Sequence, residues 1–469
     1  MLETEFMRIA VHGHMGRDAA AVDNLLRHGH EINAVGSWPN PNVIEAVEAS
    51  GGRFGKVPNI YDAKAVADFV HTIKPDLFYT HFDDSLAAGT VDEIQKRVRK
   101  NWMPPVLIAS PNEKSARVEW DKFELRKILD KVAPQYNPDY NFMVTTEEEA
   151  FAAINSLESE GIQVVIKPRN PTGGKGVKVM GKHFNSYEEA KAYAHEVLND
   201  PNQAGLEVQE RMDVDSNGEP IGHEFTLQFI TDGNEIILVP ATYDYPYRED
   251  GDHGPGTGGM GTFSQADGLL PFLNEDDYQE MADLTRKILA EMKDRELDFK
   301  GVFYLSAIKQ QNGKKKVIEV NARGGDPELI NILDLLEEDV DYGEVLRLIA
   351  EGELRPDSMR FKEAASALIY LVSKGYGYEK QPTLGFDLDK VAVEALGANV
   401  RFAAGVKIGE NRYQTASTSR IVGISALGPT PWAARQTIHD AIEDGFNGQV
   451  PFDYRDDVGS EDYLSTLVL

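Results

Sequence analysis

Carboxylate, amide and guanidinium side chains follow one another closely in the segment 317–328, VIEVNARGGDPE. On a β-strand Glu319 and Asn321 face the same side, and the apolar residues that alternate with them face a core. A carboxylate and a carboxamide oxygen together suit Mg²⁺, which often completes its shell with nucleotide phosphates. Arg323 lies further along, where it could hold transferring charge, and Asp326 follows a glycine turn. We therefore predict a metal-assisted phosphate site here, with a solvated polar strand face as the alternative.

A glycine-rich loop preceded by a lysine lies at 164–180, VVIKPRNPTGGKGVKVM. A hydrophobic strand ends in Lys167, and the loop returns into a second strand. Successive exposed amide groups in such a turn form an anion-binding nest, beside which Lys167 supplies a point charge. The GxxxxGKS/T pattern of P-loops is absent, and a hairpin with an exposed lysine is the alternative. The predicted loop consists of Gly173, Gly174, Lys175 and Gly176.

Two further stretches are candidates for contacts with a nucleotide and with reacting groups. QERM (209–212) followed by HEFTLQ (223–228) offers backbone groups to adenine and the Glu224 carboxylate to ribose hydroxyls; taken alone, this pattern also fits a structural role. Residues 253–264, HGPGTGGMGTFS, contain five glycines, which are costly to order. Such a bare backbone is either a slack loop or a segment that another group must approach closely.

Alternating strand-like and helix-like runs place these segments in a fold. The first ~125 residues read as a doubly wound parallel sheet with crossover helices, with the informative loops at the carboxyl ends of the strands. A charged amphipathic helix is predicted over 112–131. The last part has strands at 365–373, 400–408 and 419–428 and then one helix. Between them lies a β-rich region with two helices and strands at 161–168, 177–183, 206–212, 223–230, 234–243, 301–310 and 314–321.

Composition excludes several classes of protein. The 469 residues include 41% hydrophobic and 27% charged residues, as in an ordinary globular protein, and no apolar run is long enough to span a membrane. The absence of cysteine removes disulfides, thiolate nucleophiles and Cys-based metal sites, and a cytoplasmic protein without a signal peptide is expected. The net charge of −29 disfavours nucleic acid and anionic membranes as partners, so any phosphate site must concentrate its basic groups locally.

These segments, in this order and spacing, resemble the ATP-grasp ligases, and most closely the phosphoribosylamine–glycine ligase family. That family has a GPNTGGMG-like loop where this chain has GPGTGGMG, and an EFNCRFGDPE-like segment where it has EVNARGGDPE. An IK…GGKGV-type loop matches Ile166–Lys167 and Gly173–Val177, and the similarity continues into RFAAGVKI and SRIVGISALG near the end. The resemblance therefore covers essentially the whole chain.

The resemblance implies a two-step reaction of purine biosynthesis. ATP phosphorylates the carboxylate of glycine, and 5-phosphoribosylamine then attacks the acyl phosphate, which gives glycinamide ribonucleotide, ADP and phosphate. Such chemistry requires positioning and charge neutralisation rather than an enzyme nucleophile. The alternatives are a related ligase with another amine or amino acid, and a nucleotide-binding protein that has lost catalysis. The implied cofactors are ATP with Mg²⁺ or Mn²⁺, and the chain is expected as a monomer or homodimer.

The resemblance also assigns roles to individual residues. The implied ATP-binding residues are Lys122, Lys167, Gly173, Gly174, Lys175, Gly176, Gln209, Glu210, Met212 and Glu224. The implied metal ligands are Glu319 and Asn321. The residues expected around the acyl phosphate are Arg323, Asp326, Gly258 and Gly259. The residues expected around the amine substrate are Gly13, Gly16, Arg17, Asp18, Asp83 and Thr257.

The chain departs from the family mainly on the side of the amine substrate. The first loop reads GHMGRDAA (13–20) instead of a GNGGREHA-like sequence, and HFDDSL (81–86) replaces a GPEAPL-like one. TSRI (418–421) replaces a GGRV-like one, and glycine replaces phenylalanine before Asp326. The first loop still precedes a predicted helix, whose N-terminus favours a phosphate group. His12 and His14 face the same side, but no third metal ligand is evident nearby.

The predicted fold class is α/β and α+β multidomain: an ATP-grasp ligase with an N-terminal doubly wound α/β domain and a small C-terminal β-rich domain. The predicted domains are 1–111, 112–361 with a nucleotide-covering subdomain at about 132–212, and 362–469.

Overall fold

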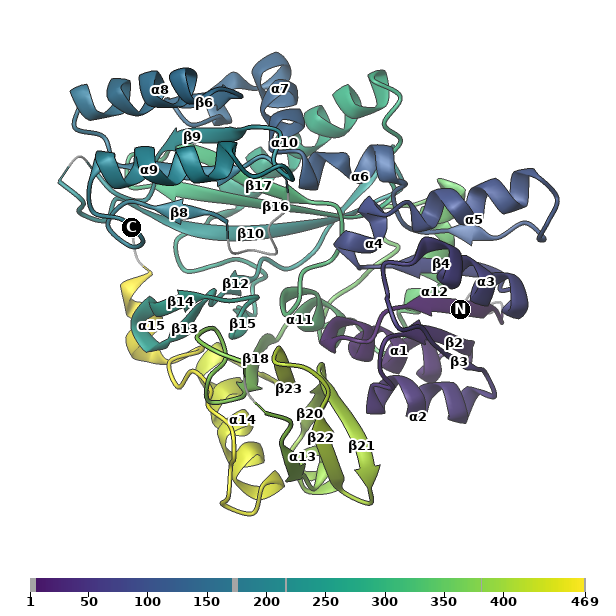
Figure 1. Cartoon of the computed structure of the whole chain (residues 1–469). Helices are drawn as coiled ribbons and strands as arrows, with labels where there is room; N and C mark the ends of the chain where they lie inside the picture. Colours follow the sequence, from purple (N-terminus) through teal and green to yellow (C-terminus); the bar gives the residue numbers. More distant parts are fainter. Residues whose placement is uncertain (1–5, 171–175, 216, 381, 468–469) are drawn as a thin grey trace.

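The computed structural model describes residues 6–170, 176–215, 217–380 and 382–467, which form several sheets with helices packed on them (Figure 1). The mixed α/β architecture predicted from the sequence is confirmed. One continuous apolar core includes Phe78, Phe303 and Ile424, which come from three different sheets. Among the described residues, no helix is both long and apolar enough to cross a membrane.

The N-terminal sheet has five parallel strands in the order β3-β2-β1-β4-β5. Chain order reverses between β1 and β4, so the loops that follow these two strands meet at one edge of the sheet, where doubly wound proteins bind ligands. The strands are β1 (Arg8–His12), β2 (Glu31–Gly36), β3 (Phe54–Lys56), β4 (Leu77–Thr80) and β5 (Leu107–Ile108). The helices between them are α1 (Gly16–Arg27), α2 (Pro41–Ser50), α3 (Ala63–Ile73), α4 (Asp83–Ala87) and α5 (Thr90–Arg99).

Two antiparallel four-stranded sheets form the middle of the molecule. The first has the order β6-β9-β7-β8 and the second the order β11-β10-β16-β17. The first contains β6 (Asn141–Val144), β7 (Val164–Pro168), β8 (Lys178–Val179) and β9 (Leu206–Glu210), with α8 (Glu147–Ser159) and α9 (Tyr187–Leu198) beside them. The second contains β10 (Gly222–Thr231), β11 (Ile236–Leu238), β16 (Gly301–Gln310) and β17 (Lys315–Asn321), followed by α11 (Glu328–Asp334) and α12 (Tyr342–Glu351); α10 (Glu275–Asp294) precedes β16.

The single helix predicted over 112–131 is wrong, because the structure has two helices there. α6 (Glu113–Trp120) and α7 (Lys122–Val132) are separated by Asp121, whose backbone is extended (φ −105°, ψ 95°); η1 (Pro134–Tyr136) follows. The Asp121 carboxylate accepts a hydrogen bond from the main-chain N–H of Phe123 (3.1 Å) and two from Arg169 (2.8 Å each). The capping bond and the ion pair with a distant residue stabilise the break, which hydrophobic periodicity does not reveal.

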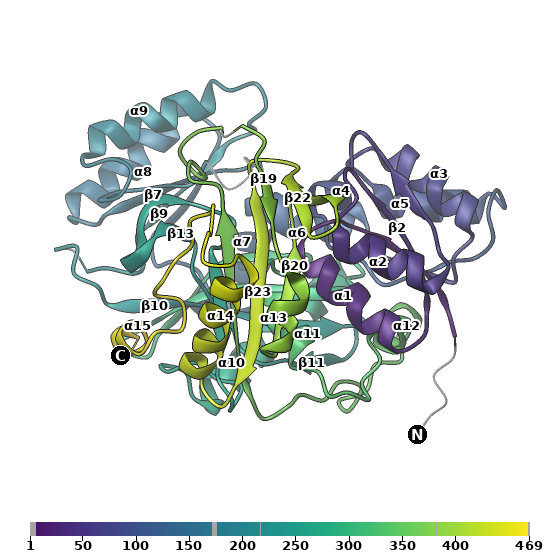
Figure 2. The same cartoon turned by 90° about the horizontal axis from the view of Figure 1, so that it is seen from below.

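The C-terminal sheet combines strands from two distant parts of the chain (Figure 1), and Figure 2 shows its strands β20 and β23 from below. Its order is β12-β15-β18-β23-β20, so the predicted boundary after residue 361 divides this sheet. The strands are β12 (Tyr243–Asp244), β15 (Gly261–Ser264), β18 (Ala365–Val372), β20 (Ala398–Phe402) and β23 (Arg420–Gly428). The hairpin of β13 (Tyr247–Glu249), η2 (Asp250–Asp252) and β14 (His253–Gly256) precedes β15.

Two expectations for the last part need correction. The predicted strand 400–408 is two strands, β20 and β21 (Gly405–Gly409), and β21 belongs to a three-stranded sheet with β22 (Arg412–Thr415) and β19 (Gly385–Asp387). The chain turns at Ala403–Ala404 because these buried residues pass from one sheet to the other. Two helices follow β23 instead of one, α14 (Pro431–Gly445) and α15 (Glu461–Thr466), and α13 (Lys390–Ala395) precedes β20.

A fully buried ion pair connects the two middle sheets. Arg126 on α7 and Glu207 on β9 are 1% and 0% exposed, and Arg126 Nε lies 2.5 Å from Glu207 Oε1. The same guanidinium donates to the carbonyl oxygens of Val317 (2.9 Å) and Ile318 (3.0 Å) on β17. Burial raises the pKa of Glu207, but the charges of Arg126 and Lys167 outweigh burial and hold it below its usual range. The pair thus fixes the approach of β17 to the small β6–β9 sheet.

We expect the substitution Arg126→Met to lower the free energy of unfolding by about 3–5 kcal/mol, because it leaves the Glu207 carboxylate buried without a partner. The double variant R126M/E207Q should recover part of this loss. Denaturant titration monitored by circular dichroism measures both. As a matched control, Arg286→Ala removes an exposed ion pair with Asp283 and should change stability by about 0–1 kcal/mol. Equal losses for the two single variants would contradict the prediction.

Candidate active site

The end of β17 carries the predicted metal-binding side chains. Glu319 and Asn321 lie together, with Asn321 Nδ2 at 3.4 Å from Glu319 Oε1. Lys122, at the start of α7, donates to Glu319 Oε2 at 2.9 Å. The positive charge of Lys122 lowers the pKa of Glu319 to about 2, so the carboxylate is ionised at neutral pH. The strand therefore presents one negative charge and one amide oxygen at the same place.

A metal ion here would need ligands from outside the protein. In the described ranges no three His, Cys, Asp or Glu side chains form a group that could hold a metal. Mg²⁺ is usually bound by one or two carboxylates together with substrate phosphates and water. Glu319 and Asn321 fit that pattern, since they supply the protein's share of such a shell and leave the rest to a nucleotide.

Two lysines bring positive charge to the same strand. Lys167 at the end of β7 is 4% exposed, and its Nζ lies 3.4 Å from the carbonyl oxygen of Ile318. Burial lowers its pKa to about 8. Lys122 and Lys167 therefore reach β17 from two different elements, as phosphate contacts would require. Gly176 is buried and its carbonyl accepts from Tyr193 Oη at 2.7 Å. Gly173, Gly174 and Lys175 lie outside the described residues.

The residues predicted around adenine and ribose lie at the end of β9 and the start of β10. Gln209 Oε1 accepts from Arg126 at 3.3 Å, and the carbonyl oxygen of Met212 accepts from Gln310 Nε2 at 3.0 Å. The Glu210 carboxylate is turned toward the main-chain N–H groups of residues 139 and 140. Glu224 is exposed, with Oε1 at 2.9 Å from Ser306 Oγ on β16. The four nucleotide contacts remain predictions.

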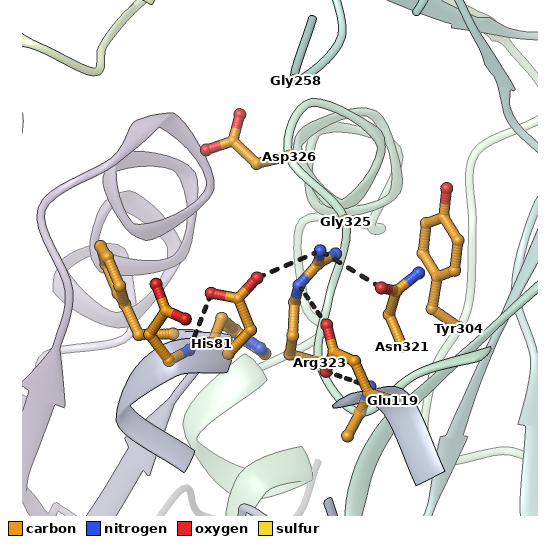
Figure 3. Close-up of polar contacts among 12 residues, drawn as sticks. His81, Glu119, Gly258, Tyr304, Asn321, Arg323, Gly325 and Asp326 are labelled. Atoms are coloured by element: carbon orange, nitrogen blue, oxygen red, sulfur yellow. Dashed lines mark hydrogen bonds and ion pairs between the residues drawn. The ribbon is translucent and has the colours of Figure 1, made fainter. Parts of the chain in front are cut away.

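Arg323, two residues after β17, is surrounded by oxygen atoms (Figure 3). Its guanidinium lies 3.5 Å from Asn321 Oδ1, 3.7 Å from Asp83 Oδ2 and 3.6 Å from Glu119 Oε1. It also lies 5.8 Å from the centre of the Tyr304 ring. Burial raises the pKa of Glu119 to about 7. Although burial raises the pKa of Asp83 too, the charges of Arg323 and Arg17 lower it further, so this carboxylate is ionised.

The N-terminus of α1 faces a carboxylate of the protein itself. Although burial raises the pKa of Asp326, the charges of Arg420 and Arg17 lower it further, and the main-chain N–H of Arg17 acts in the same direction. The Arg17 guanidinium donates to the carbonyl oxygen of Gly324 at 2.8 Å. A Cβ added at Gly16 would lie 2.1 Å from the hydroxyl of Tyr370, which donates to Asp326 at 2.6 Å. Asp326 thus occupies the anion position that the sequence predicted for a phosphate group. A phosphate at this helix would have to share the site with Asp326 or displace it.

Asp18 and Gly13 lie behind the loop rather than in front of it. A Cβ added at Gly13 would lie 2.2 Å from Asp18 Cγ, and Asp18 accepts from the main-chain N–H of Met15 at 2.8 Å. Asp18 is 0% exposed, and burial raises its pKa to about 7. In this conformation its carboxylate supports the loop, and the predicted contact with ribose hydroxyls requires the loop to open.

His14 also points away from the site. Its ring lies 3.7 Å from that of Trp38 and 5.0 Å from that of Phe82. His12 contacts the carbonyl oxygen of Ile60 at 3.1 Å. Burial lowers the pKa of His12 to about 4 and that of His14 to about 3, so both rings are neutral and serve packing.

The glycine loop reaches the site through backbone contacts. Arg420, the first residue of β23, donates to the carbonyl oxygens of Gly258 and Asp326 and lies 4.8 Å from the Tyr370 ring. Gly259 has φ +97°, and a Cβ there would lie 2.6 Å from Pro327 Cδ. The loop therefore packs against the GGDPE segment through its main chain, and a close approach of this kind is what glycine permits. Thr257 turns inward, and its hydroxyl donates to the carbonyl oxygen of Pro246 at 2.9 Å.

Several buried polar atoms around Arg323 have no hydrogen-bond partner among the described residues. A buried unpaired donor or acceptor costs about 1–3 kcal/mol, so each of these atoms lowers the stability of the site as it stands. They include both donors and acceptors. The donors are Arg17 Nε, Arg323 Nε, Arg420 Nε and Gln228 Nε2, and the acceptors are Asp244 Oδ1 and Asp326 Oδ2.

The residue types at the end of β17 identified part of this site, but four residues that belong to it were missed. Glu119 and Tyr304 flank Arg323, and His81 Nδ1 accepts from the main-chain N–H of Gly324 at 3.2 Å. Arg420 is the fourth. His81 lies in the altered stretch 81–86 and Arg420 in TSRI (418–421). Both stretches correspond to motifs of the resembled family, and this correspondence could have indicated the two residues. Nothing in the local sequence distinguishes Glu119 or Tyr304.

Comparison with known proteins agrees with this geometry. Residues 127–329 match the family model for the ATP-grasp (A) domain of phosphoribosylglycinamide synthetase. Along 98% of its length the chain is 31% identical to phosphoribosylamine–glycine ligase from Methanobrevibacter smithii, of which it covers 98%. It is also 31% identical to the enzyme of that name from Thermococcus gammatolerans, over 85% of this chain and 84% of that one.

Solved structures share the fold. The crystal structure of phosphoribosylamine–glycine ligase from Thermotoga maritima superposes with a TM-score of 0.72 at 19% identity, covering 96% of this chain and 99% of that one. The biotin carboxylase domain of 2-oxoglutarate carboxylase from Hydrogenobacter thermophilus superposes with a TM-score of 0.70 at 14% identity, covering 98% and 96%. The predicted ATP-grasp fold is therefore confirmed, and the chain belongs to the phosphoribosylamine–glycine ligase family.

Proposed function

We propose that the chain joins glycine to 5-phosphoribosylamine at the expense of ATP, giving glycinamide ribonucleotide, ADP and phosphate in purine biosynthesis. The observation that carries the proposal is the meeting of Glu319, Asn321 and Arg323 with two lysines from other elements, Lys122 and Lys167, beside unpaired donors and acceptors. Family membership along nearly the whole chain supports the same reaction.

The chain's own groups can perform the first step by positioning and charge neutralisation. A carboxylate oxygen of glycine attacks the γ-phosphorus of ATP, the bond from that phosphorus to the bridging oxygen of ADP breaks, and glycyl phosphate forms. Lys122 and Lys167 would neutralise phosphate charge, and Arg323 would hold the carboxylate that is being phosphorylated. A divalent cation held by Glu319 and Asn321, Mg²⁺ or Mn²⁺, would supply further neutralisation of phosphate charge.

The second step needs the amine close to the acyl carbon and water kept out. The amine nitrogen attacks the carbonyl carbon, the bond to the phosphate oxygen breaks, phosphate leaves, and the nitrogen loses a proton. The Gly258–Gly259 backbone and Asp326 lie where they could enclose this intermediate. Arg17 would contribute positive charge toward the phosphate end of the amine, supported by its place at the N-terminus of α1. The cytoplasmic location and the monomer or homodimer remain predictions.

The direct test measures ADP release with glycine, with and without phosphoribosylamine. The proposal expects product formation that depends on both substrates, with one ATP consumed for each amide formed. ADP release with another amine alone would favour a related ligase, and nucleotide binding without turnover would favour a non-catalytic protein.

The variant Glu319→Gln should lower ligation about 100-fold or more while the fold persists, because it keeps the side-chain volume and removes the charge that balances the cation. Calorimetric titration of ATP with and without Mg²⁺ provides a readout that is independent of turnover, and the variant should lose the Mg²⁺-dependent gain in affinity. Normal turnover at ordinary Mg²⁺ concentrations would contradict the assignment.

The variant Gly258→Val should reduce turnover far more than stability, because its Cβ would lie 3.2 Å from the Arg420 guanidinium at the edge of the site. Gly256→Val is the matched control in the same hairpin, since a Cβ there meets nothing within 4 Å. Turnover and melting temperature of both variants provide the measurement. Gly259→Val is less informative, since the positive φ there makes it unstable for backbone reasons. Equal losses of activity in Gly256→Val and Gly258→Val would argue for a structural loop.

Arg17→Ala should raise the KM for the phosphorylated amine about 10- to 150-fold and barely change the KM for ATP, since one charge-assisted contact is worth about 1.5–3 kcal/mol. Arg27→Ala, on the same helix but paired on the surface with Glu338, is the control and should change neither. Ligation that proceeds equally well with an unphosphorylated amine, or that is indifferent to Arg17, would indicate that the amine site serves another substrate.

A further inference from the structure

We infer that Arg455, which touches no reacting group, is a positioning residue for the ligation: it anchors the β13–β14 hairpin so that the Gly258–Gly259 backbone at its end encloses the acyl phosphate. The inference rests on the proposed function for its catalytic meaning. Its structural content, that Arg455 holds the glycine loop in place, can be tested without any substrate.

Arg455 is a buried charge shared between two carboxylates. Its side chain is 0% exposed, with NH1 at 2.7 Å from Asp252 Oδ1 and Nε at 2.7 Å from Asp457 Oδ1. The guanidinium lies 4.7 Å from the centre of the Tyr245 ring and 5.7 Å from that of the Tyr463 ring. Asp457 belongs to the C-terminal segment, whereas Asp252 belongs to the turn of the hairpin. The group therefore joins two segments that are distant in sequence.

The turn that Arg455 holds has an unusual backbone. Gly251 and Asp252 have φ values of +66° and +60°, a region that an aspartate residue adopts only at some cost. The Asp252 carboxylate accepts from Tyr463 Oη at 2.6 Å in addition to Arg455. The main-chain N–H of Gly251 donates to Asp457 Oδ2 at 2.9 Å. The C-terminal segment thus surrounds the turn and offsets the cost of its conformation.

The hairpin has little strength of its own. Its two strands pair only at Tyr247–Gly256 and Glu249–His253, with a register shift between them. An isolated two-stranded hairpin is marginally stable in water, so this one depends on external contacts. Arg455 supplies one at each end, since NH1 also donates to the carbonyl oxygen of Tyr247 at 3.3 Å.

The hairpin passes directly into the candidate active site. The main-chain N–H of Thr257 donates to the carbonyl oxygen of Pro246 at 2.7 Å, and Gly259 N–H donates to Thr257 Oγ1 at 3.1 Å. A change in the register of β13 and β14 would therefore move the Gly258 carbonyl, to which Arg420 donates. Arg455 thus fixes the hairpin, and Arg420 fixes the Gly258 carbonyl that follows it.

A loosened loop should have a chemical consequence that loss of stability does not have. If the loop opens, water attacks the carbonyl carbon of glycyl phosphate, the bond to the phosphate oxygen breaks, and glycine and phosphate are released. ATP is then consumed without amide formation. The ratio of amide formed to ADP released measures this, and a reduced amount of folded enzyme leaves the ratio unchanged because it lowers both quantities equally.

The test compares Arg455→Lys with Arg435→Lys. Arg435 on α14 donates to the carbonyl oxygen of Asp456 at 2.7 Å, so it holds the same C-terminal segment through Asp456, whereas Arg455 contacts the hairpin directly. We expect the amide-to-ADP ratio to fall at least about twofold in Arg455→Lys, because the compact ammonium group of lysine lacks the planar fork of donors that reaches Asp252, Asp457 and the Tyr247 carbonyl together. The ratio should stay at the wild-type value in Arg435→Lys. An unchanged ratio in both variants, or an equal fall in both, would overturn the inference.

Two further measurements keep the test decisive. If Arg455→Lys does not fold, Tyr463→Phe removes only the hydroxyl that holds Asp252, and it should lower the ratio in the same direction by a smaller amount. Hydrogen–deuterium exchange of residues 253–261 needs no substrate and should be about tenfold faster in Arg455→Lys than in Arg435→Lys. Unchanged exchange would refute the anchoring role, whereas a wild-type enzyme that makes no amide would refute the proposed reaction alone.

Discussion

Three guanidinium groups converge on the short segment 324–326, and the candidate site depends on this convergence. Arg17 comes from the N-terminal sheet region, Arg323 from the end of β17, and Arg420 from the C-terminal sheet. Each donates to a carbonyl oxygen of that segment. Because three like charges repel one another, the arrangement requires carboxylates nearby, and Asp326 and Asp83 fulfil that requirement. The sheets are thus held together at the place where the reaction is proposed.

Local sequence patterns predicted the strands that carry the candidate site residues, because a strand is recognisable from a few neighbouring residues. Glu319 and Asn321 alternate with apolar residues, so their strand and their shared side follow from the period of a β-strand. The position of Lys167 at the end of a strand, before a glycine-rich loop, was predicted in the same way. The contacts around these residues were not readable, because they are made by residues from far along the chain. Arg126 contacts β17 across nearly two hundred positions of the chain. The hydrophobic periodicity of a helix or strand carries no information about such a contact.

The differences between the sequence-based expectations and the structure have physical causes that can be named. The predicted helix 112–131 is interrupted at Asp121, because the carboxylate of this residue accepts hydrogen bonds from Arg169, which follows β7. The hydrophobic pattern nevertheless continues through the break. The N-terminus of α1 was predicted to bind a ligand's phosphate group, yet Asp326 lies there; the electrostatic argument was sound, but the sequence does not say which anion meets the helix. Asp18 was predicted to contact a ribose because a carboxylate suits hydroxyl groups, whereas in the structure it is buried and accepts from the main-chain N–H of Met15.

The C-terminal sheet has a consequence for how the polypeptide emerges from the ribosome. β15 pairs with β18, so the strand that follows the glycine loop has no neighbour on that edge until residues 365–372 have been synthesised. During translation β15 can pair with β12, which precedes it, but its other edge stays unpaired and is open to the wrong partners. Premature termination before β18 would leave this edge of β15 without its partner strand. The glycine loop can therefore make all its contacts only after Arg420, which donates to the Gly258 carbonyl oxygen, has also been synthesised.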